Sequence, residues 1–318
     1  MCTLIVLRRP GSAWPLLVAA NRDELASRPA RPPGRHWPDR AEVVAGLDLQ
    51  AGGSWLGLND HGVVAGILNR VGTLGPASGK RSRGELVLEA LDHADAASAA
   101  AALAAIDPDA YRPFNLIIAD VGDAFWLRHA GGMPGFGFGT ASGAWREALP
   151  HQVAGSVVGG TTRSDTLECH ALPDGLSMIT AHDLNDEGSP RVRHYLPLFR
   201  SAPPPEPDRD DWASWTTLLA ARASPDGDPL GAMSVVTTGD YGTVSSCLIG
   251  LPAAGEPVMK FASGRPDQAP YASVPLRAAY HHASEDGQHR LGGAGRDEQT
   301  KLQGVKKPEK KTPPLKSE

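Results

Sequence analysis

Residues 1–25, MCTLIVLRRPGSAWPLLVAANRDEL, decide the fold class of this chain. Two runs within this stretch, Thr3–Leu7 and Pro15–Ala20, are apolar at nearly every position, and only about seven residues separate them. Strands that are apolar throughout are normally buried on both faces. In α/β proteins a helix joins such strands, whereas a connection this short forms a hairpin, so the sequence predicts an antiparallel sheet.

The same pattern continues along the chain. Apolar runs at Val63–Leu68, Asn115–Ala119 and, more weakly, Ser246–Leu251 predict further strands, and only Asn59–Gly62 separates the two strands of a second hairpin. Amphipathic or Ala-rich stretches predict helices at 81–94, 95–106, 190–199 and 211–223. An antiparallel sheet buried on both sides needs a helix layer on one face, and we expect a second sheet on the other.

Length and charge narrow the class of protein. The 318 residues suit one large domain, which we predict over 1–282, and from about Ala283 the chain becomes Gly-, Lys- and Pro-rich, which predicts a disordered tail over 283–318. Lys301–Glu318 holds six Lys and two Glu, so a net charge of −5 leaves −9 on the remainder. An acidic body argues against a nucleic-acid partner.

Features that the sequence lacks indicate its cellular compartment and whether it binds a metal or a cofactor. No apolar run approaches the roughly 18 residues of a membrane span, and the apolar stretch after Met1 is too short for a secretion signal, so we expect a cytoplasmic protein. The three Cys show no CxxC spacing and the eleven His no metal spacing, so the sequence predicts neither metal nor cofactor. We expect Cys169 and Cys247, in apolar strand contexts, to be buried and inert.

Cys2 is the first candidate for chemistry. Removal of Met1 would leave a terminal Cys that carries both a thiol and a free α-amine. An α-amine titrates near 7.7–8.0 and can act as a base at neutral pH, while the thiol is a strong nucleophile. One residue would then supply both groups. The alternative is a Cys that only begins a strand.

Polar residues gather at the predicted strand ends. With the first turn centred near Gly11, Cys2 lies opposite Ala20, and Asn21–Glu24 follow directly. A carboxylate there would hold and orient the ammonium form of the amine. With the second turn near Asp60–His61, Asn69 falls opposite Gly52–Gly53, where its amide could face an oxyanion and the glycines permit close approach of a ligand. Asn and Gly are also ordinary turn residues.

Six blocks of sequence, in order, resemble the NRDE family, also called the transport and Golgi organisation 2 family. The resemblance extends from Met1 to about Tyr271. The blocks are MCTLIVL (1–7), LLVAANRDELASRP (16–29), GGSWLGLNDHGVVAGILNR (52–70), RSRGELV (81–87), FNLIIAD (114–120) and DYGTVSSCLIGL (240–251).

This resemblance implies an N-terminal-nucleophile hydrolase: an α+β protein with a four-layer αββα sandwich, in which two stacked antiparallel sheets lie between helix layers. The superfamily's cysteine branch includes bile-salt and penicillin V acylases, which cleave linear amide bonds. On their pattern, Cys2 corresponds to the nucleophile, Asn21 and Asp23 to the Asn-x-Asp motif, and Asn69 to the oxyanion residue.

The sequence departs from the acylase pattern at two positions and from the NRDE-type pattern at one. Ala20 stands where the acylases have Arg, and the nearest Arg is Arg22, which either supports the site electrostatically or contacts an anionic substrate group. Our alignment places His182 where the acylases have a later Asn. Val244 stands where NRDE-type chains often have Arg.

Two hypotheses for function follow. The first is an amidohydrolase on a linear, non-peptide C–N bond: Cys2 as nucleophile and base, Asp23 orienting the amine, Asn69 and Arg22 stabilising charge, and Asn21, His182 and Gly53 contacting substrate or oxyanion. Its ligand would be a small acyl-amide. The second is a non-catalytic protein that binds or carries a lipid-like ligand or haem in the same pocket, since a terminal thiol also ligates haem iron.

Overall fold

A computed structural model describes residues 2–131 and 167–276, which lie within one unit of the chain, Met1–Ala278. The predicted tail, 283–318, lies outside the described residues. The predicted domain boundary at residue 282 therefore stays a prediction.

The first sheet has six strands in the order β10-β1-β2-β11-β12-β13, and each pairs antiparallel with its neighbours. The predicted first hairpin is confirmed by the pairing of β1 with β2, and β2 runs on past the predicted strand through Asn-Arg-Asp-Glu. The strands are β1 (Thr3–Arg8), β2 (Leu16–Leu25), β10 (Gly175–Ile179), β11 (Tyr241–Leu251), β12 (Val258–Ala262) and β13 (Ala272–Ser273).

The second sheet has seven antiparallel strands in sequence order, β3 to β9. Its centre is the predicted second hairpin, β5–β6, continued by β7. The strands are β3 (Ala30–Gly34), β4 (Val43–Asp48), β5 (Leu56–Asn59), β6 (Val64–Asn69), β7 (Phe114–Ala119), β8 (Ala124–His129) and β9 (Leu167–Ala171).

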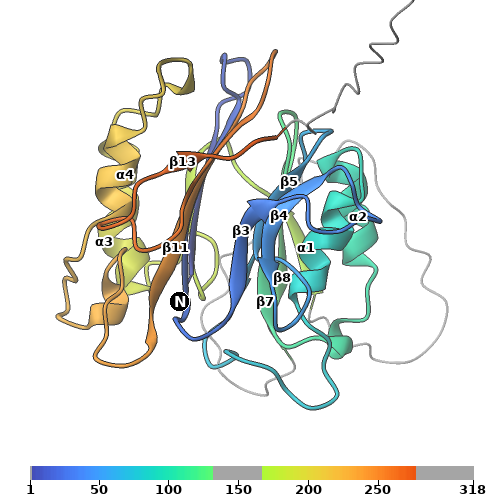
Figure 1. Ribbon diagram of the computed structural model, residues 1–318, viewed down its shortest axis with the longest axis horizontal. Coiled ribbons are helices and arrows are strands. Elements are labelled where there is room, and N and C mark those ends of the chain that lie inside the picture. The colour runs from blue at the N-terminus through green and yellow to red at the C-terminus, as the bar shows by residue number, and fades with distance from the viewer. Residues whose placement is uncertain (1, 132–166, 277–318) are drawn as a thin grey trace, which may run out of the picture. The chain divides into compact units, whose positions relative to one another are not determined.

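Helices cover the outer face of each sheet (Figure 1). The helices α1 (Gly84–Leu91) and α2 (Ala96–Ala104) pack on the second sheet, and α3 (Pro190–Ser201) and α4 (Ala213–Leu219) on the first. Short 3₁₀ turns lie at Pro108–Ala110, Pro207–Arg209 and Pro229–Gly231. The layer order is helix, sheet, sheet, helix, and it confirms the predicted αββα sandwich.

Alternation along β1 explains why its sequence is apolar throughout. Leu4 and Val6 lie in the core between the two sheets, whereas Ile5 and Leu7 lie in the core beneath α3 and α4. Side chains of a strand point alternately to its two faces, so a sheet covered on both faces needs apolar residues at every position. The same alternation decides which residues at the strand ends face the space between the sheets.

The predicted register of the first hairpin was wrong by two residues. Thr3 pairs with Asn21, so Cys2 lies beside Arg22 and not opposite Ala20. The connection spans Arg9–Pro15, closed by a hydrogen bond from the Arg9 amide to the Pro15 carbonyl, and its centre lies one residue after Gly11. A turn centre moved by one residue shifts the partner of every strand residue by two.

Candidate functional site

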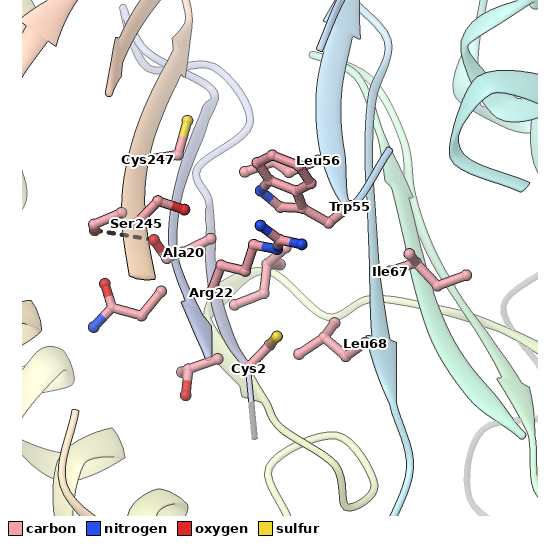
Figure 2. Close-up of a pocket in the computed structure, with 13 residues that line it drawn as sticks. Cys2, Ala20, Arg22, Trp55, Leu56, Ile67, Leu68, Ser245 and Cys247 are labelled. Carbon is pink, nitrogen blue, oxygen red and sulfur yellow. Dashed lines mark hydrogen bonds between the residues drawn. The ribbon is translucent and has the colours of Figure 1, made fainter. Parts of the chain in front are cut away.

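A narrow cavity lies between the two sheets and collects several of the predicted residues (Figure 2). Its volume is about 20 Å³, room for about one water molecule. Cys2 lies at one end, and the side chains of Arg22 and Trp55 lie next to each other within it (Figure 2). The lining residues are Cys2, Thr3, Leu4, Ala20, Asn21, Arg22, Trp55, Leu56, Ile67, Leu68, Ser245, Ser246 and Cys247.

Cys2 precedes β1 and packs against the core between the sheets, partly exposed. Its thiol donates a weak hydrogen bond to the backbone carbonyl of Asp23, with Sγ and O 3.6 Å apart. Burial raises the pKa of the Cys2 thiol, and the Asp23 carboxylate raises it further, while the Arg22 cation acts in the opposite direction. A thiol with a raised pKa is neutral at pH 7, so it needs a base before it can attack a carbonyl.

Arg22 faces the same cavity from β2. Its side chain is only 8% exposed, and the guanidinium carbon lies 4.0 Å from the centre of the Trp55 ring. Within the described ranges, no carboxylate lies at ion-pair distance from it, and burial lowers the pKa of Arg22. The cavity therefore holds a desolvated cation that is stacked on an aromatic face and is available to a developing negative charge.

Asp23 lies on the opposite face of β2 from Arg22, in a buried network beneath α3. Its Oδ2 accepts from Nη1 of Arg191 at 3.0 Å, and its Oδ1 accepts from Oγ1 of Thr243 at 2.6 Å. Arg191 also donates to Oγ1 of Thr3 at 2.6 Å. The Asp23 and Arg191 side chains are at most 1% exposed, so the pair is a fully buried salt bridge. It ties the strand end that carries Cys2 to the outer helix layer.

A register shift in β11 positions Thr243 to bond with Asp23 in this network. Thr243 pairs with Asp23 and Ser245 with Arg22, so Val244 is the extra residue of a β-bulge. Because the bulge lies between the two pairs, Thr243 reaches the outer face while Ser245 lines the cavity. Neither Arg191 nor Thr243 was among the predicted site residues.

The Asn21 amide serves the helix layer rather than the cavity. Its Nδ2 donates to the backbone carbonyls of Leu219 and Met233, each at 2.9 Å. Leu219 ends α4, so this buried side chain joins β2 to the outer helices. The structure therefore directs the Asn21 amide away from Cys2.

Asn69 is not brought to the cavity. It pairs with Phe114 of β7, and Phe114 lies in the core beneath α1 and α2. Residues that pair across antiparallel strands point to the same face, so Asn69 faces the helix side, whereas Leu68 before it lines the cavity. The strand β5 begins only at Leu56, so the predicted pairing of Asn69 with Gly52–Gly53 does not form.

Gly53 packs against the start of α1 and is not among the cavity-lining residues. A Cβ at Gly53 would lie 2.4 Å from the backbone carbon of Gly84, and the Ser54 amide donates to the Gly84 carbonyl at 3.0 Å. The close approach at Gly53 is therefore made by the backbone at the start of α1 and not by a ligand.

The replacement Gly53→Ala is expected to destabilise the protein by about 1–3 kcal/mol, because the methyl group forces the α1 backbone away from the second sheet. Urea unfolding measures this loss. Gly62→Ala, at a turn position with nothing within 4 Å of its Cβ but a φ of +84°, serves as a control for backbone strain alone. Equal effects of the two replacements would contradict the close contact.

His182 lies in the loop after β10, outside the cavity lining. Its backbone carbonyl accepts from the Asn115 amide at 2.7 Å, while the neighbouring Asp183 pairs with Arg70 and Arg128. These contacts hold the loop against the second sheet. The prediction that His182 contacts substrate gains no support from its place in the fold.

Cys247 is buried as predicted, and burial raises its pKa. The prediction for Cys169 was wrong, because β9 is the edge strand of the second sheet and leaves its thiol exposed. Across residues 2–131 and 167–276, no group of three or more His, Cys, Asp or Glu could hold a metal ion. In the same ranges, no helix is long and apolar enough to cross a membrane.

Alkylation of Cys2 is expected to be slow at pH 7 and to rise continuously toward pH 9, because the raised pKa keeps the thiol neutral at lower pH. Mass spectrometry of the N-terminal peptide after iodoacetamide treatment measures the rate. The Cys169→Ser variant removes the exposed thiol. A rate that is already maximal and independent of pH between 6 and 8 would show a stable thiolate and contradict this prediction.

The first part of the chain matches a known protein family and its curated members. Residues 1–141 match the model of the family described as Transport and Golgi organisation 2. The Transport and Golgi organization protein 2 homologues of Bos taurus and Homo sapiens are 39% and 35% identical to this chain, over 116 and 118 residues. These matches cover 35% and 36% of this chain, which spans only 40% and 41% of those two proteins. The predicted resemblance to this family is confirmed over residues 1–141.

Solved structures resemble the chain over most of its length. A Caenorhabditis elegans orthologue of N-acylethanolamine-hydrolyzing acid amidase is 13% identical, with a TM-score of 0.49 over 86% of this chain and 100% of its own. A conjugated bile acid hydrolase variant from Clostridium perfringens is 10% identical, with a TM-score of 0.44 over 89% of this chain and all of its own. The helix–sheet–sheet–helix order of this chain is established by its own strands and helices and not by these similarities.

Proposed function

We propose that this chain, whose first 141 residues match the Transport and Golgi organisation 2 family, is an N-terminal cysteine hydrolase of linear, non-peptide amide bonds. The observation that carries the proposal is the position of Cys2. Its thiol lies at the end of a cavity that also holds a buried cation, Arg22, and beside a strand end whose carboxylate, Asp23, is held in place. These are a nucleophile, a charge for the oxyanion and an anchor for an amine.

The reaction starts once Met1 is removed. The free α-amine of Cys2 takes the thiol proton, and Sγ bonds to the carbonyl carbon of the amide. The tetrahedral intermediate then breaks its C–N bond, and the ammonium returns the proton to the leaving nitrogen. A thioester remains on Cys2. Water, deprotonated by the same amine, attacks the thioester, releases the acid and restores the thiol.

The raised pKa of Cys2 favours this use of the amine. A thiol that stays neutral at pH 7 cannot attack by itself, whereas an α-amine with a pKa near 7.7–8.0 is partly unprotonated there. By the register of β1 and β2, Cys2 lies beside Arg22, and its Sγ lies 3.6 Å from the backbone carbonyl oxygen of Asp23. The Asp23 carboxylate, fixed by Arg191 and Thr243, would orient the ammonium form.

Arg22, rather than Asn69, is the group that we assign to the oxyanion. Its guanidinium shares the cavity with Cys2, while Asn69 faces the helix side of the second sheet. Arg22→Met is expected to lower kcat by about 10²–10³-fold, the usual cost of removing one oxyanion donor, and Asn69→Ala is expected to leave kcat within about threefold. The reverse order of effects would return the oxyanion role to Asn69.

Substrate entry requires the Arg22–Trp55 stack to separate. A cavity of about 20 Å³ does not admit an acyl chain, and the two stacked side chains come from opposite sheets. The same volume excludes haem and lipid from this arrangement, so the geometry does not favour the carrier function over hydrolysis.

The test uses the N-terminus itself. Intact mass shows whether Met1 is absent, and turnover is then screened on a panel of N-acyl amides. A variant with one Ala inserted between Met1 and Cys2 keeps the thiol but moves the free amine to another residue, and it is expected to lose turnover. Retained Met1 or full activity of the insertion variant would overturn the mechanism. Binding of haem or lipid without turnover would instead support a carrier.

A further inference from the structure

A second, much larger cavity lies on the outer face of the first sheet. Its volume is about 470 Å³, within the range of small-molecule sites. It lies where β1 and β10 meet the C-terminal end of α3, and its lining includes Leu7, Leu176, Phe199 and Trp215. Leu7 is five residues beyond Cys2, about 17 Å along an extended strand, and Leu7, Phe199 and Trp215 belong to the core on the helix side of the sheet. The two cavities are therefore distinct.

Charge at this cavity is positive. Arg9 and Arg200 line it, and no carboxylate in the described ranges lies at ion-pair distance from either side chain. Asp174 also lines it, but its carboxylate is already paired with Arg8 at 3.2 Å. Arg200 donates only to the backbone carbonyl of Leu176. Two cations thus remain uncompensated beside an apolar floor.

Two hydrogen-bond donors of the lining residues also lack acceptors. Nε of Arg9 and Nε1 of Trp215 are both buried, and neither finds a hydrogen-bond partner among the described residues. Trp215 itself is fully buried. Buried donors of this kind normally bond to an acceptor, because an unmade hydrogen bond inside a protein is costly. The unpaired Nε of Arg9 adds to the uncompensated positive charge of the lining residues.

We propose that this outer cavity binds an amphipathic carboxylate, with its anionic group between Arg9 and Arg200 and its apolar body against Leu7, Leu176, Phe199 and Trp215. The chemistry of the lining decides the class: the two arginine cations match a carboxylate, and the aliphatic and aromatic residues match a hydrocarbon body. A cationic or purely polar ligand would leave one of these two features unused. The site is independent of the reaction proposed at Cys2.

Calorimetric titration of the full chain with decanoate tests this site, with decanol and decylamine as probes that share the tail and differ in the head group. Decanoate is expected to bind at least about tenfold more tightly than either, because only its carboxylate can pair with Arg9 and Arg200; tenfold corresponds to about 1.4 kcal/mol of binding free energy. Arg200→Gln is expected to weaken decanoate binding by a similar factor and to leave decanol unchanged. Arg200 is exposed and makes only one backbone contact, so this variant should fold.

Three controls keep the outcomes separate. Arg193→Gln changes a cation of the same helix that already pairs with Asp226, and it should leave binding unchanged. Leu176→Trp fills the cavity and should abolish binding of both decanoate and decanol. Cys2→Ala should have no effect. Equal affinity for decanoate and decanol, or decanoate binding unaffected by both Arg200→Gln and Leu176→Trp, would overturn the proposal.

Discussion

Cys2→Ala is expected to abolish amide hydrolysis, with a loss in kcat of about 10³-fold or more, because no other group in the cavity can form the thioester. Cys247 lines the same cavity but is buried in a strand at the opposite end from Cys2 (Figure 2). Its thiol also lacks the adjacent terminal amine. The measurement is turnover of whichever N-acyl amide the wild-type protein cleaves.

The matched control for this prediction is Cys169→Ser, which removes an exposed thiol far along the chain from the cavity and should leave turnover unchanged. A Cys2→Ser variant keeps a hydroxyl nucleophile next to the amine and should retain a small residual rate. A mass increase on Cys2 equal to the acyl group, seen in wild type during turnover, would identify the thioester directly. Unchanged turnover in Cys2→Ala would remove the nucleophile from the proposal.

Arg191→Met is expected to destabilise the fold by about 3–5 kcal/mol, the second large effect. The replacement leaves the Asp23 carboxylate buried without its cation, and a charge of that kind is costly in a low-dielectric interior. It also removes the hydrogen bond to Thr3 at the start of β1. Urea denaturation measures the change in the free energy of unfolding.

Arg193→Met is the matched control, two residues further along α3. Its ion pair with Asp226 is about half exposed on both sides, so its loss should cost no more than about 1 kcal/mol. The double variant Arg191→Met with Asp23→Leu removes both charges and should be more stable than Arg191→Met alone. Equal stabilities for the Arg191 and Arg193 variants would show that the buried pair contributes no more than a surface pair.

Local pattern was enough to predict the hairpins and the helices, and the family resemblance implied the four-layer order. Apolar runs joined by short connections predicted the two hairpins, and amphipathic or Ala-rich stretches predicted the four helices of the described residues, because both signals depend on neighbours in sequence. Three of the six blocks that carried the family resemblance, 1–7, 16–29 and 52–70, contain the strands β1, β2, β5 and β6 beside the cavity. Cys2 and Arg22 were accordingly among the candidates before any geometry was known.

The face of the sheet to which each side chain points depended on pairing between strands far apart in the sequence. Asn69 was placed in the site by its position at a strand end, but its face follows from pairing with Phe114, which is 45 residues away in sequence. The hairpin register required the true extent of the Arg9–Pro15 connection, and a bulge at Val244 set the partners of Asp23 and Arg22. In each case a one-residue difference moves a side chain to another partner or the other face.

The sequence alone predicted the two hairpins, the helices and the presence of a thiol at residue 2, because hydrophobic periodicity and chain order are local properties. Only the tertiary structure decided that Arg22 shares the cavity with Cys2, that Asn21 and Asn69 do not turn their amides toward it, and that Arg191 holds Asp23. Those outcomes depend on which strands pair, in which register, and which helix covers each face. These choices are made by contacts between residues far apart in the chain.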